Sequence, residues 1–343
     1  MDDVVRRLNL RHESGRTFQL AGATMHLYTI VGGAPVRQVI TALQADATVV
    51  TAQPNYIYTL AQTTSSTTND SQYAITRLGI TDVHKITRGA GVSVAVIDSG
   101  IDFSHPELAA NSSVTLDVTS EENPVPHKHG TSIAGIIASA GTLTGVAPEA
   151  PVIGIRAFDT SSGEPSSSSW LIATALDMAN KNGAGVVNMS FAGPHDPLIE
   201  RSVAGAAKRG IVTVAAAGNA GPDAAPLYPA AYEEVIAVTA VDSKDGLFAG
   251  ANTGDYVAIS APGVDILAPA PNGGYDISTG TSMAAAHVSG MIALLLSRKP
   301  DLTRANVLQV LGASATDLGA PGVDSQFGLG IPKASSALDA LGI

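Results

Sequence analysis

The segment Val94-Ala95-Val96-Ile97-Asp98-Ser99-Gly100-Ile101-Asp102 decides the fold of this chain. From Val92 to Ile97 the residues are mostly apolar and do not alternate with polar ones, which is typical of a parallel strand covered on both faces. The run ends in a carboxylate followed by Ser-Gly, which predicts a turn at the carboxyl end of the strand. Functional side chains of open α/β sheets gather at such ends.

The same pattern continues downstream of this segment. Short apolar runs that predict further strands alternate with stretches of helical periodicity, and this alternation predicts a doubly wound, mostly parallel α/β sheet with helices on both faces. The expected strands are Val152 to Phe158, Val186 to Met189, Ile211 to Ala216 and Val235 to Val241, and the expected helices are His129 to Ser139, Ser169 to Asn182 and Leu198 to Arg209.

Two more glycine-flanked segments carry chemistry: His129-Gly-Thr-Ser-Ile-Ala-Gly135 and Gly280-Thr-Ser282-Met-Ala-Ala-Ala-His-Val-Ser-Gly290. A serine hydroxyl is a weak nucleophile until a base removes its proton, and histidine, with a pKa of about 6.5, suits that task near neutral pH. The order aspartate, histidine, serine assigns Ser282 as nucleophile, His129 as general base and acid, and Asp98 as the group that orients the imidazole.

Each of these three residues alone has a commoner structural interpretation. A serine at a helix start is usually a cap, an aspartate at a strand end usually caps a turn, and a lone histidine is usually a surface or core residue. Their joint order and their flanking glycines favour the catalytic interpretation.

Together these motifs, from about Tyr73 to Leu341, resemble the subtilisin-like serine proteases (subtilases). The resemblance implies a serine endopeptidase that acts on protein or peptide substrates through an acyl-enzyme on Ser282, with no organic cofactor. It also implies that Asn219, in Ala215-Ala-Ala-Gly-Asn219, donates its side-chain amide to the oxyanion.

The resemblance further assigns a substrate-binding region. Ser190, Phe191, Ala192 and Gly193 match the strand that binds the substrate backbone, and Glu164 and Ser166 are expected to supply the opposite edge. Ala192 stands where the family usually has glycine, and we expect its methyl group to crowd the groove. Leu227 stands where many relatives have glycine, which predicts a preference for small or medium apolar residues before the cut.

Residues 1–60 precede the catalytic motifs and predict a small α+β module, with a strand over 24–31, a helix over 34–45 and a strand over 48–60. The end of the module, from Ala52 to Leu60, resembles the tail of the pro-domains that act as folding chaperones and intramolecular inhibitors of subtilases. An unrelated N-terminal cap is the alternative. Residues 61–72 are small and polar, as in a linker, and residues 73–343 form the expected catalytic domain. We expect self-processing between Tyr58 and Gln72.

The composition excludes other classes of function. A net charge of −11 argues against nucleic-acid partners and anionic membranes, and the absence of cysteine excludes thiol catalysis and thiolate zinc sites. The longest apolar run, Met283 to Leu296, is too short to span a bilayer and predicts a buried helix.

The N-terminal residues lack a secretory pattern, whereas the resemblance implies secretion, so a cytoplasmic location stays open. We expect a monomer.

No metal ligands are assigned from the sequence. Many subtilases hold calcium with the loop after the catalytic-histidine helix and an upstream carboxylate, and calcium needs six to eight oxygen ligands. Here the loop Ser139-Ala-Gly-Thr-Leu-Thr-Gly145 is short and lacks Asn and Asp, and Glu107 is the candidate carboxylate. Calcium remains possible, but a high-affinity site is not expected.

Two rival functions stay open. An intact set of triad residues does not prove an aligned one, so the chain could be a catalytically silent or self-inhibited binding module. Covalent labelling of Ser282 would distinguish an active protease from such a silent or self-inhibited module. An esterase or peptide ligase with the same acyl-enzyme would be recognised by transfer to added amines.

Overall fold

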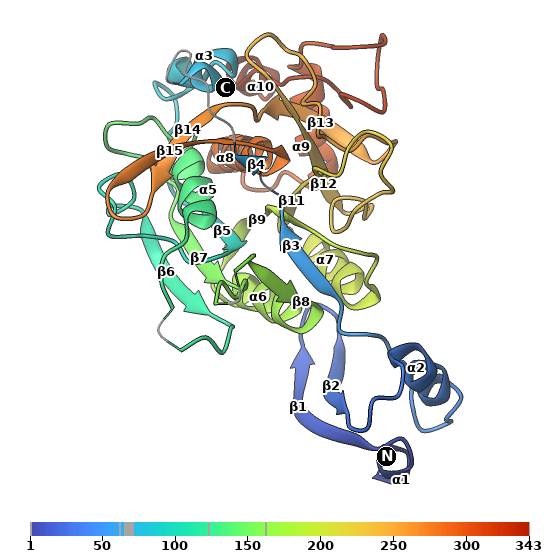
Figure 1. Ribbon diagram of the computed structural model, residues 1–343. Coiled ribbons are helices and arrows are strands. Elements are labelled where there is room, and N and C mark those ends of the chain that lie inside the picture. Colours follow the sequence, from blue (N-terminus) through green and yellow to red (C-terminus); the bar gives the residue numbers. More distant parts are fainter. Residues whose placement is uncertain (1, 62, 65–71, 123, 162, 343) are drawn as a thin grey trace.

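A seven-stranded parallel sheet forms the centre of the computed structural model, which describes residues 2–61, 63–64, 72–122, 124–161 and 163–342 (Figure 1). The strand order is β13-β12-β11-β9-β5-β7-β6, and every neighbouring pair is parallel. The strands are β5 (Ser93–Asp98), β6 (Ser112–Asp117), β7 (Val152–Arg156), β9 (Ala184–Met189), β11 (Val212–Ala216), β12 (Val235–Val241) and β13 (Val257–Pro262).

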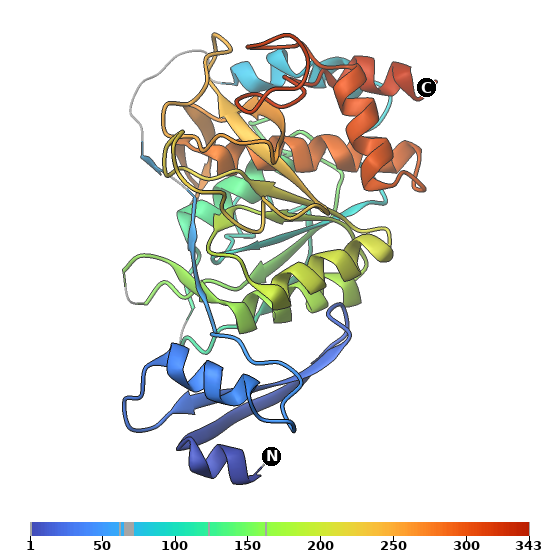
Figure 2. The same ribbon diagram turned by 90° about the vertical axis from the view of Figure 1, so that its right-hand side faces the viewer.

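Helices cover both faces of this sheet, as Figure 2 shows. One face carries α5 (Lys128–Ala138) and α8 (Thr281–Arg298), and the other carries α6 (Ser169–Lys181) and α7 (Pro197–Lys208). Each face has its own apolar core, so the predicted doubly wound α/β fold is confirmed. Four shorter helices complete the body: α3 (Tyr73–Arg77), α4 (Ile80–Val83), α9 (Arg304–Ala313) and α10 (Ala334–Ala340).

Helix α8 contains the longest apolar run and lies against five strands of the sheet. Every residue from Thr281 to Leu296 is buried, which explains why the helix is apolar around its whole circumference. Across the described residues, no helix combines the length and the apolar character needed to cross a bilayer.

An antiparallel hairpin of β14 (Ile266–Ala270) and β15 (Gly274–Thr279) lies outside the main sheet and against α5. The sequence did not predict it, nor the edge strands β6 and β13. Pro269 lies inside β14, and proline usually argues against a strand because it lacks a backbone donor.

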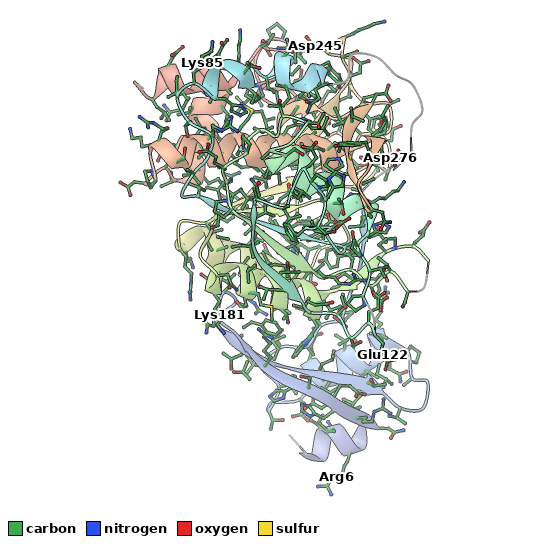
Figure 3. The ribbon with its side chains drawn as sticks, turned by 90° about the vertical axis from the view of Figure 1, so that its left-hand side faces the viewer. Arg6, Lys85, Glu122, Lys181, Asp245 and Asp276 are labelled. Carbon is green, nitrogen blue, oxygen red and sulfur yellow. The ribbon has the colours of Figure 1, made fainter. Side chains whose placement is uncertain are left out.

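The N-terminal module consists of α1 (Asp2–Arg7), β1 (Leu10–Phe18), β2 (Ala23–Ile30) and α2 (Val36–Gln44), with β1 and β2 forming an antiparallel hairpin. Strand β1 was missed because most of its side chains are exposed, so it has no apolar alternation. Of the strand expected over 48–60, only β3 (Ile57–Leu60) forms. Figure 3 shows the module below the body, with Arg6 at its far end and Lys181 of the body facing it.

The turn of the β1–β2 hairpin docks on the body beneath the sheet. Phe18 and Leu20 are buried in the core on that face, and the Phe18 ring lies edge-to-face on Trp170, 5.0 Å between centroids. The Asp177 carboxylate accepts two backbone N–H groups of the turn, at 2.8 and 2.9 Å. A Cβ on Gly205 would lie 2.0 Å from the Leu20 carbonyl oxygen, so only glycine permits this approach of α7.

Candidate active site

Asp98, His129 and Ser282 lie at the ends of three elements at the carboxyl edge of the sheet, and the first two are in direct contact. Asp98 ends β5, His129 lies in the first turn of α5, and Ser282 lies in the first turn of α8. All three are fully buried, and His129 Nδ1 lies 2.7 Å from Asp98 Oδ1 and 2.9 Å from Oδ2. Ser99 fixes the carboxylate by donating its backbone N–H and its hydroxyl to Oδ1, at 2.7 and 3.0 Å.

The hydroxyl of Ser282, the expected nucleophile, is occupied by the chain itself. Ser282 Oγ donates to the backbone carbonyl of Ala61 and lies 3.2 Å from the carbonyl oxygen of Ser190. His129 Nε2 is buried and has no hydrogen-bond partner among the described residues. Proton transfer from Ser282 to His129 therefore requires that Oγ leave these two acceptors.

Asn219 follows β11 and presents a free donor to the same region. Its Oδ1 accepts the backbone N–H of Thr281 at 3.1 Å and the Thr281 hydroxyl at 2.8 Å. The side-chain nitrogen Nδ2 is buried and has no partner within the described part of the chain. The backbone N–H of Ser282 lies in the first helical turn, where N–H groups lack intrahelical acceptors. The arrangement can therefore stabilise a developing oxyanion.

A segment of the N-terminal region runs through the groove beside these residues. Strand β3 lies between β8 (Ser166–Ser168) and β10 (Phe191–Ala192) and is antiparallel to both. Beyond Ala61, the short strand β4 (Thr63–Thr64) pairs with β15. The chain thus crosses the site from one side of Ser282 to the other.

The expected substrate-binding residues differ in their relation to β3. Ala192 and Ser166 each lie opposite Thr59, on the two sides of β3, so the Ala192 methyl group does not keep an extended strand out of the groove, contrary to expectation. Phe191 lies opposite Leu60. Glu164 precedes β8 and is exposed, so the opposite edge runs over Ser166–Ser168 rather than from Glu164.

Three other expected residues border the groove. Ser190 accepts the backbone N–H of Ala61 at 3.3 Å through its carbonyl oxygen. Gly193 exchanges two backbone hydrogen bonds with Tyr228, at 2.8 and 3.0 Å. Leu227 lies against Gly218, where an added Cβ would be 2.8 Å from its Cδ1, so its side chain fills space next to Asn219.

Sequence reasoning missed one residue that positions the base. His127 caps α5, with Nδ1 accepting the backbone N–H of His129 at 3.3 Å and lying 3.1 Å from Ser99 Oγ. Burial lowers the pKa of His127, and the nearby Asp98 opposes this shift. Its position directly before the helix was the only available signal, and histidine is not among the usual capping residues.

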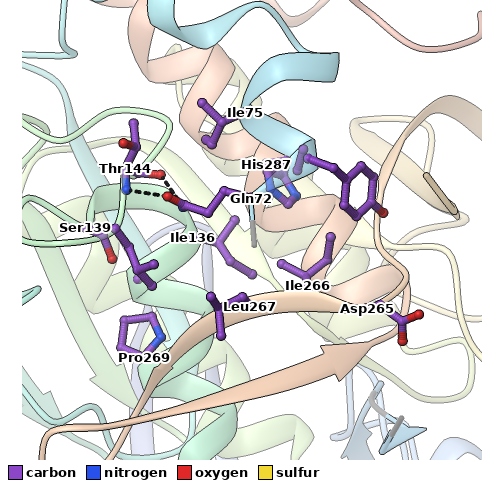
Figure 4. Close-up of a pocket in the computed structure, with 14 residues that line it drawn as sticks. Gln72, Ile75, Ile136, Ser139, Thr144, Asp265, Ile266, Leu267, Pro269 and His287 are labelled. Atoms are coloured by element: carbon purple, nitrogen blue, oxygen red, sulfur yellow. Dashed lines mark hydrogen bonds between the residues drawn. The ribbon is translucent and has the colours of Figure 1, made fainter. Parts of the chain in front are cut away.

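Glu107 and Gln72 hold the loop that follows α5. The Glu107 carboxylate accepts the Tyr275 hydroxyl at 2.9 Å and the backbone N–H groups of Gly141, Thr142 and Leu143 at 2.9, 2.8 and 3.0 Å. Gln72 bonds both backbone groups of Thr144 through its side-chain amide, each at 3.0 Å (Figure 4). N–H groups aimed at the carboxylate repel a cation, so these residues do not fit a calcium ion.

Among the described residues, no cluster of three or more His, Asp or Glu side chains is placed to hold a metal ion.

Of the linker expected over 61–72, residues 62 and 65–71 lie outside the described residues.

The chain is similar to known proteins over about two thirds of its length. The family model described as "Subtilase family" matches residues 89–330. Subtilisin DY of Bacillus licheniformis is 36% identical over 236 residues, covering 68% of this chain and 86% of that protein. Subtilisin E of Bacillus subtilis (strain 168) is 42% identical over 242 residues, covering 67% of this chain and 62% of that protein.

Among solved structures, the chain is similar to fervidolysin of Fervidobacterium pennivorans, which is described as a keratinolytic enzyme related to subtilisin. The TM-score is 0.84 at 26% sequence identity, and the match covers 98% of this chain and 59% of that one. The chain therefore spans less than two thirds of fervidolysin and of subtilisin E.

Proposed function

The chain belongs to the subtilase family of serine endopeptidases, and we propose that it is a self-inhibited precursor that cuts its own Ala61–Gln62 bond and then hydrolyses protein substrates. One observation carries this proposal: the Ala61 carbonyl lies against Ser282 Oγ while the residues before it pair with both edges of the groove. A peptide held in extended form with its carbonyl at an activated serine is positioned as a substrate.

The chemistry begins when Ser282 Oγ turns its proton from the Ala61 carbonyl oxygen toward His129 Nε2. Ser282 Oγ bonds to the carbonyl carbon of Ala61 as its proton passes to His129 Nε2, and the Asn219 amide and the Ser282 N–H stabilise the negative oxygen. The C–N bond to Gln62 then breaks, and His129 returns the proton to the leaving amine. Water, deprotonated by His129, hydrolyses the ester and frees Ser282.

Residues 1–60 are proposed to act as the intramolecular inhibitor before this cut and, together with Ala61, as a bound inhibitor after it. The support is that β3 is paired on both sides, so product residues keep their backbone hydrogen bonds when the bond after Ala61 is gone. Ala61 is itself small, and Leu227 fills space near the site, which supports a preference for small or medium apolar residues before the cut. Efficient cleavage after arginine or lysine would contradict this preference.

We propose further that the loop after α5 needs no calcium, because Glu107 and Gln72 already hold it. We also propose that the activity lies outside the cell, which the family resemblance supports, with a cytoplasmic location as the alternative. Cell fractionation of a producing strain, with antibody detection of the processed chain, tests that location.

The test of self-processing uses the full chain with a fluorophosphonate serine probe and intact mass measurement. We expect an adduct on Ser282 in a species that begins at Gln62. The Ser282→Ala chain should stay full length and unlabelled. A wild-type chain that keeps its full mass and takes no label would contradict the proposal, and a cut at another bond would contradict the assigned position.

A further inference from the structure

Recognition of the segment in the groove is concentrated on one side chain. Tyr58 is 0% exposed, whereas its neighbour Ile57 is 61% exposed and Thr59 faces solvent. Tyr58 is the fourth residue before the proposed cut, counting Ala61 as the first. Leu60 is half-buried, so Tyr58 is the fully buried side chain of β3 and contributes most of its apolar contact.

The walls of the Tyr58 pocket fit a flat ring. Phe191 meets the ring edge-to-face, with 5.9 Å between centroids. On another side, a Cβ on Gly193 would lie 2.5 Å from the Tyr58 ring, so the glycine makes room for an aromatic side chain. These contacts accept tyrosine and phenylalanine equally, because they involve only the ring.

A carboxylate closes the end of the pocket. The Tyr58 hydroxyl lies 3.3 Å from Asp196 Oδ2 and 3.4 Å from the carbonyl oxygen of Pro194, and Asp196 is 0% exposed. Burial, together with the Asp196 charge, raises the pKa of Tyr58, so the phenol keeps its proton and can donate it.

The other carboxylate oxygen of Asp196 already accepts three hydrogen bonds. Asp196 Oδ1 accepts Gln53 Nε2 at 2.7 Å and caps α7 by accepting the backbone N–H groups of Leu198 and Ile199, at 2.9 and 3.3 Å. The hydroxyl of the bound ring is thus the donor that faces Oδ2.

We propose that Asp196 makes this pocket selective for tyrosine at the fourth residue before the cut, in protein substrates as in the chain's own segment. The inference rests on the proposed function, which sets the position of the cut. Phenylalanine would fill the walls but leave Oδ2 without a donor in a buried pocket. Sites built to bond a hydroxyl discriminate strongly against substrates that lack one.

The first experiment compares two fluorogenic peptides on the processed enzyme, acyl-Tyr-Thr-Leu-Ala and acyl-Phe-Thr-Leu-Ala, each with the reporter after alanine. We expect kcat/KM to be at least about tenfold higher for the tyrosine peptide, the value of one hydrogen bond to a charged group. Equal or faster cleavage of the phenylalanine peptide would overturn the inference.

The Asp196→Ser variant removes Oδ2 while keeping a side chain that can cap α7. We expect its preference for tyrosine over phenylalanine to fall to about one or to reverse. Glu200→Gln is the matched control, because it removes one negative charge from the first turn of the same helix and leaves the pocket carboxylate in place. It should keep the tyrosine preference, and loss of preference in this control alone would also contradict the inference.

A second measurement does not depend on catalysis. In the full chain carrying Ser282→Ala, the fluorescence of Trp170, the one tryptophan of the sequence, reports the contact between module and body in urea. Tyr58→Phe should increase the equilibrium constant for module release about tenfold with Asp196 present and have little effect with Asp196→Ser. Equal effects in both backgrounds would overturn the inference. Suppose that Tyr58 and Asp196 are coupled in this way but the unsubstituted chain takes no label on Ser282. That result would reject the proposed function and leave the recognition of tyrosine intact.

Discussion

The N-terminal module and the catalytic body differ in how many apolar side chains they bury. The body has two large apolar cores of buried side chains, whereas an apolar groove of about 730 Å³ lies between α2 and the β1–β2 hairpin of the module. Among the described side chains before residue 57, four hydrophobic ones are buried: Val4, Phe18, Leu20 and Val39. Two of them, Phe18 and Leu20, pack against the body. The body can order itself, and the module takes much of its order from docking.

In the described part of the chain, the module meets the body in two regions that are far apart in the sequence. One is the hairpin turn at Asp177 and Gly205, and the other is the segment 53–61, which bonds to Asp196 through Gln53 and contains β3 in the groove. Because these regions are separate, single substitutions can test the module and the body one at a time. A change inside the body should alter unfolding of the whole chain, while a change at a contact should alter module release separately from unfolding of the body. The following predictions use the Ser282→Ala chain, which keeps module and body in one molecule.

The largest effect is expected for Glu107→Ala in the body. It leaves three backbone N–H groups without their acceptor and should lower the free energy of unfolding by about 3 to 5 kcal/mol. Urea unfolding followed by far-UV circular dichroism measures it, with the exposed Glu122→Ala as control. A chelator should not change the thermal midpoint of the unsubstituted chain. A fall in that midpoint would show that a cation, rather than the carboxylate alone, holds the loop.

A smaller effect is expected from acid at His287, also in the body and beside the small cavity in Figure 4. Burial lowers its pKa from 6.5 to about 4. The folded state therefore favours the neutral ring, so this contribution is complete above pH 6.5 and is lost as the pH falls toward 4. Between pH 7 and pH 5 it should cost about 2 kcal/mol of stability. His287→Gln should flatten the pH dependence by that amount, and parallel curves for the two proteins would contradict the prediction.

The smallest effect is expected for Gly205→Ala at the docking contact, where the two regions should respond with opposite signs. Alanine favours helix α7 by up to about 1 kcal/mol and should stabilise the body. Its Cβ would collide with the Leu20 carbonyl and should weaken module docking by about 1 to 2 kcal/mol. Circular dichroism follows the body and Trp170 fluorescence follows the module. Lys208→Ala, on the exposed side of the same helix, is the control, and a uniform change in both signals would remove the distinction between the regions.

Periodicity predicted the body far better than the module. Strand β12 has the predicted bounds, and the central helices begin within one residue of them, because their apolar faces are buried against the sheet. The stretch 48–56 has residues that favour a strand, yet without a partner it forms none, since strand formation depends on neighbours. The sequence also placed Asp98, His129 and Ser282 at one edge. It could not pair Tyr58 with Asp196, 138 residues away, because one buried hydrogen bond leaves no periodic pattern.

Because residues 57–61 lie in the groove, the proposed cut makes inhibition depend on protein concentration. While the chain is continuous, β3 and its groove belong to one molecule, and dilution cannot separate them. After the cut at Ala61 the module becomes a second molecule, so its occupancy of the groove depends on its concentration relative to its dissociation constant. Concentrated protein would then remain largely inhibited, and spreading into a larger volume would release active enzyme without any further chemical signal.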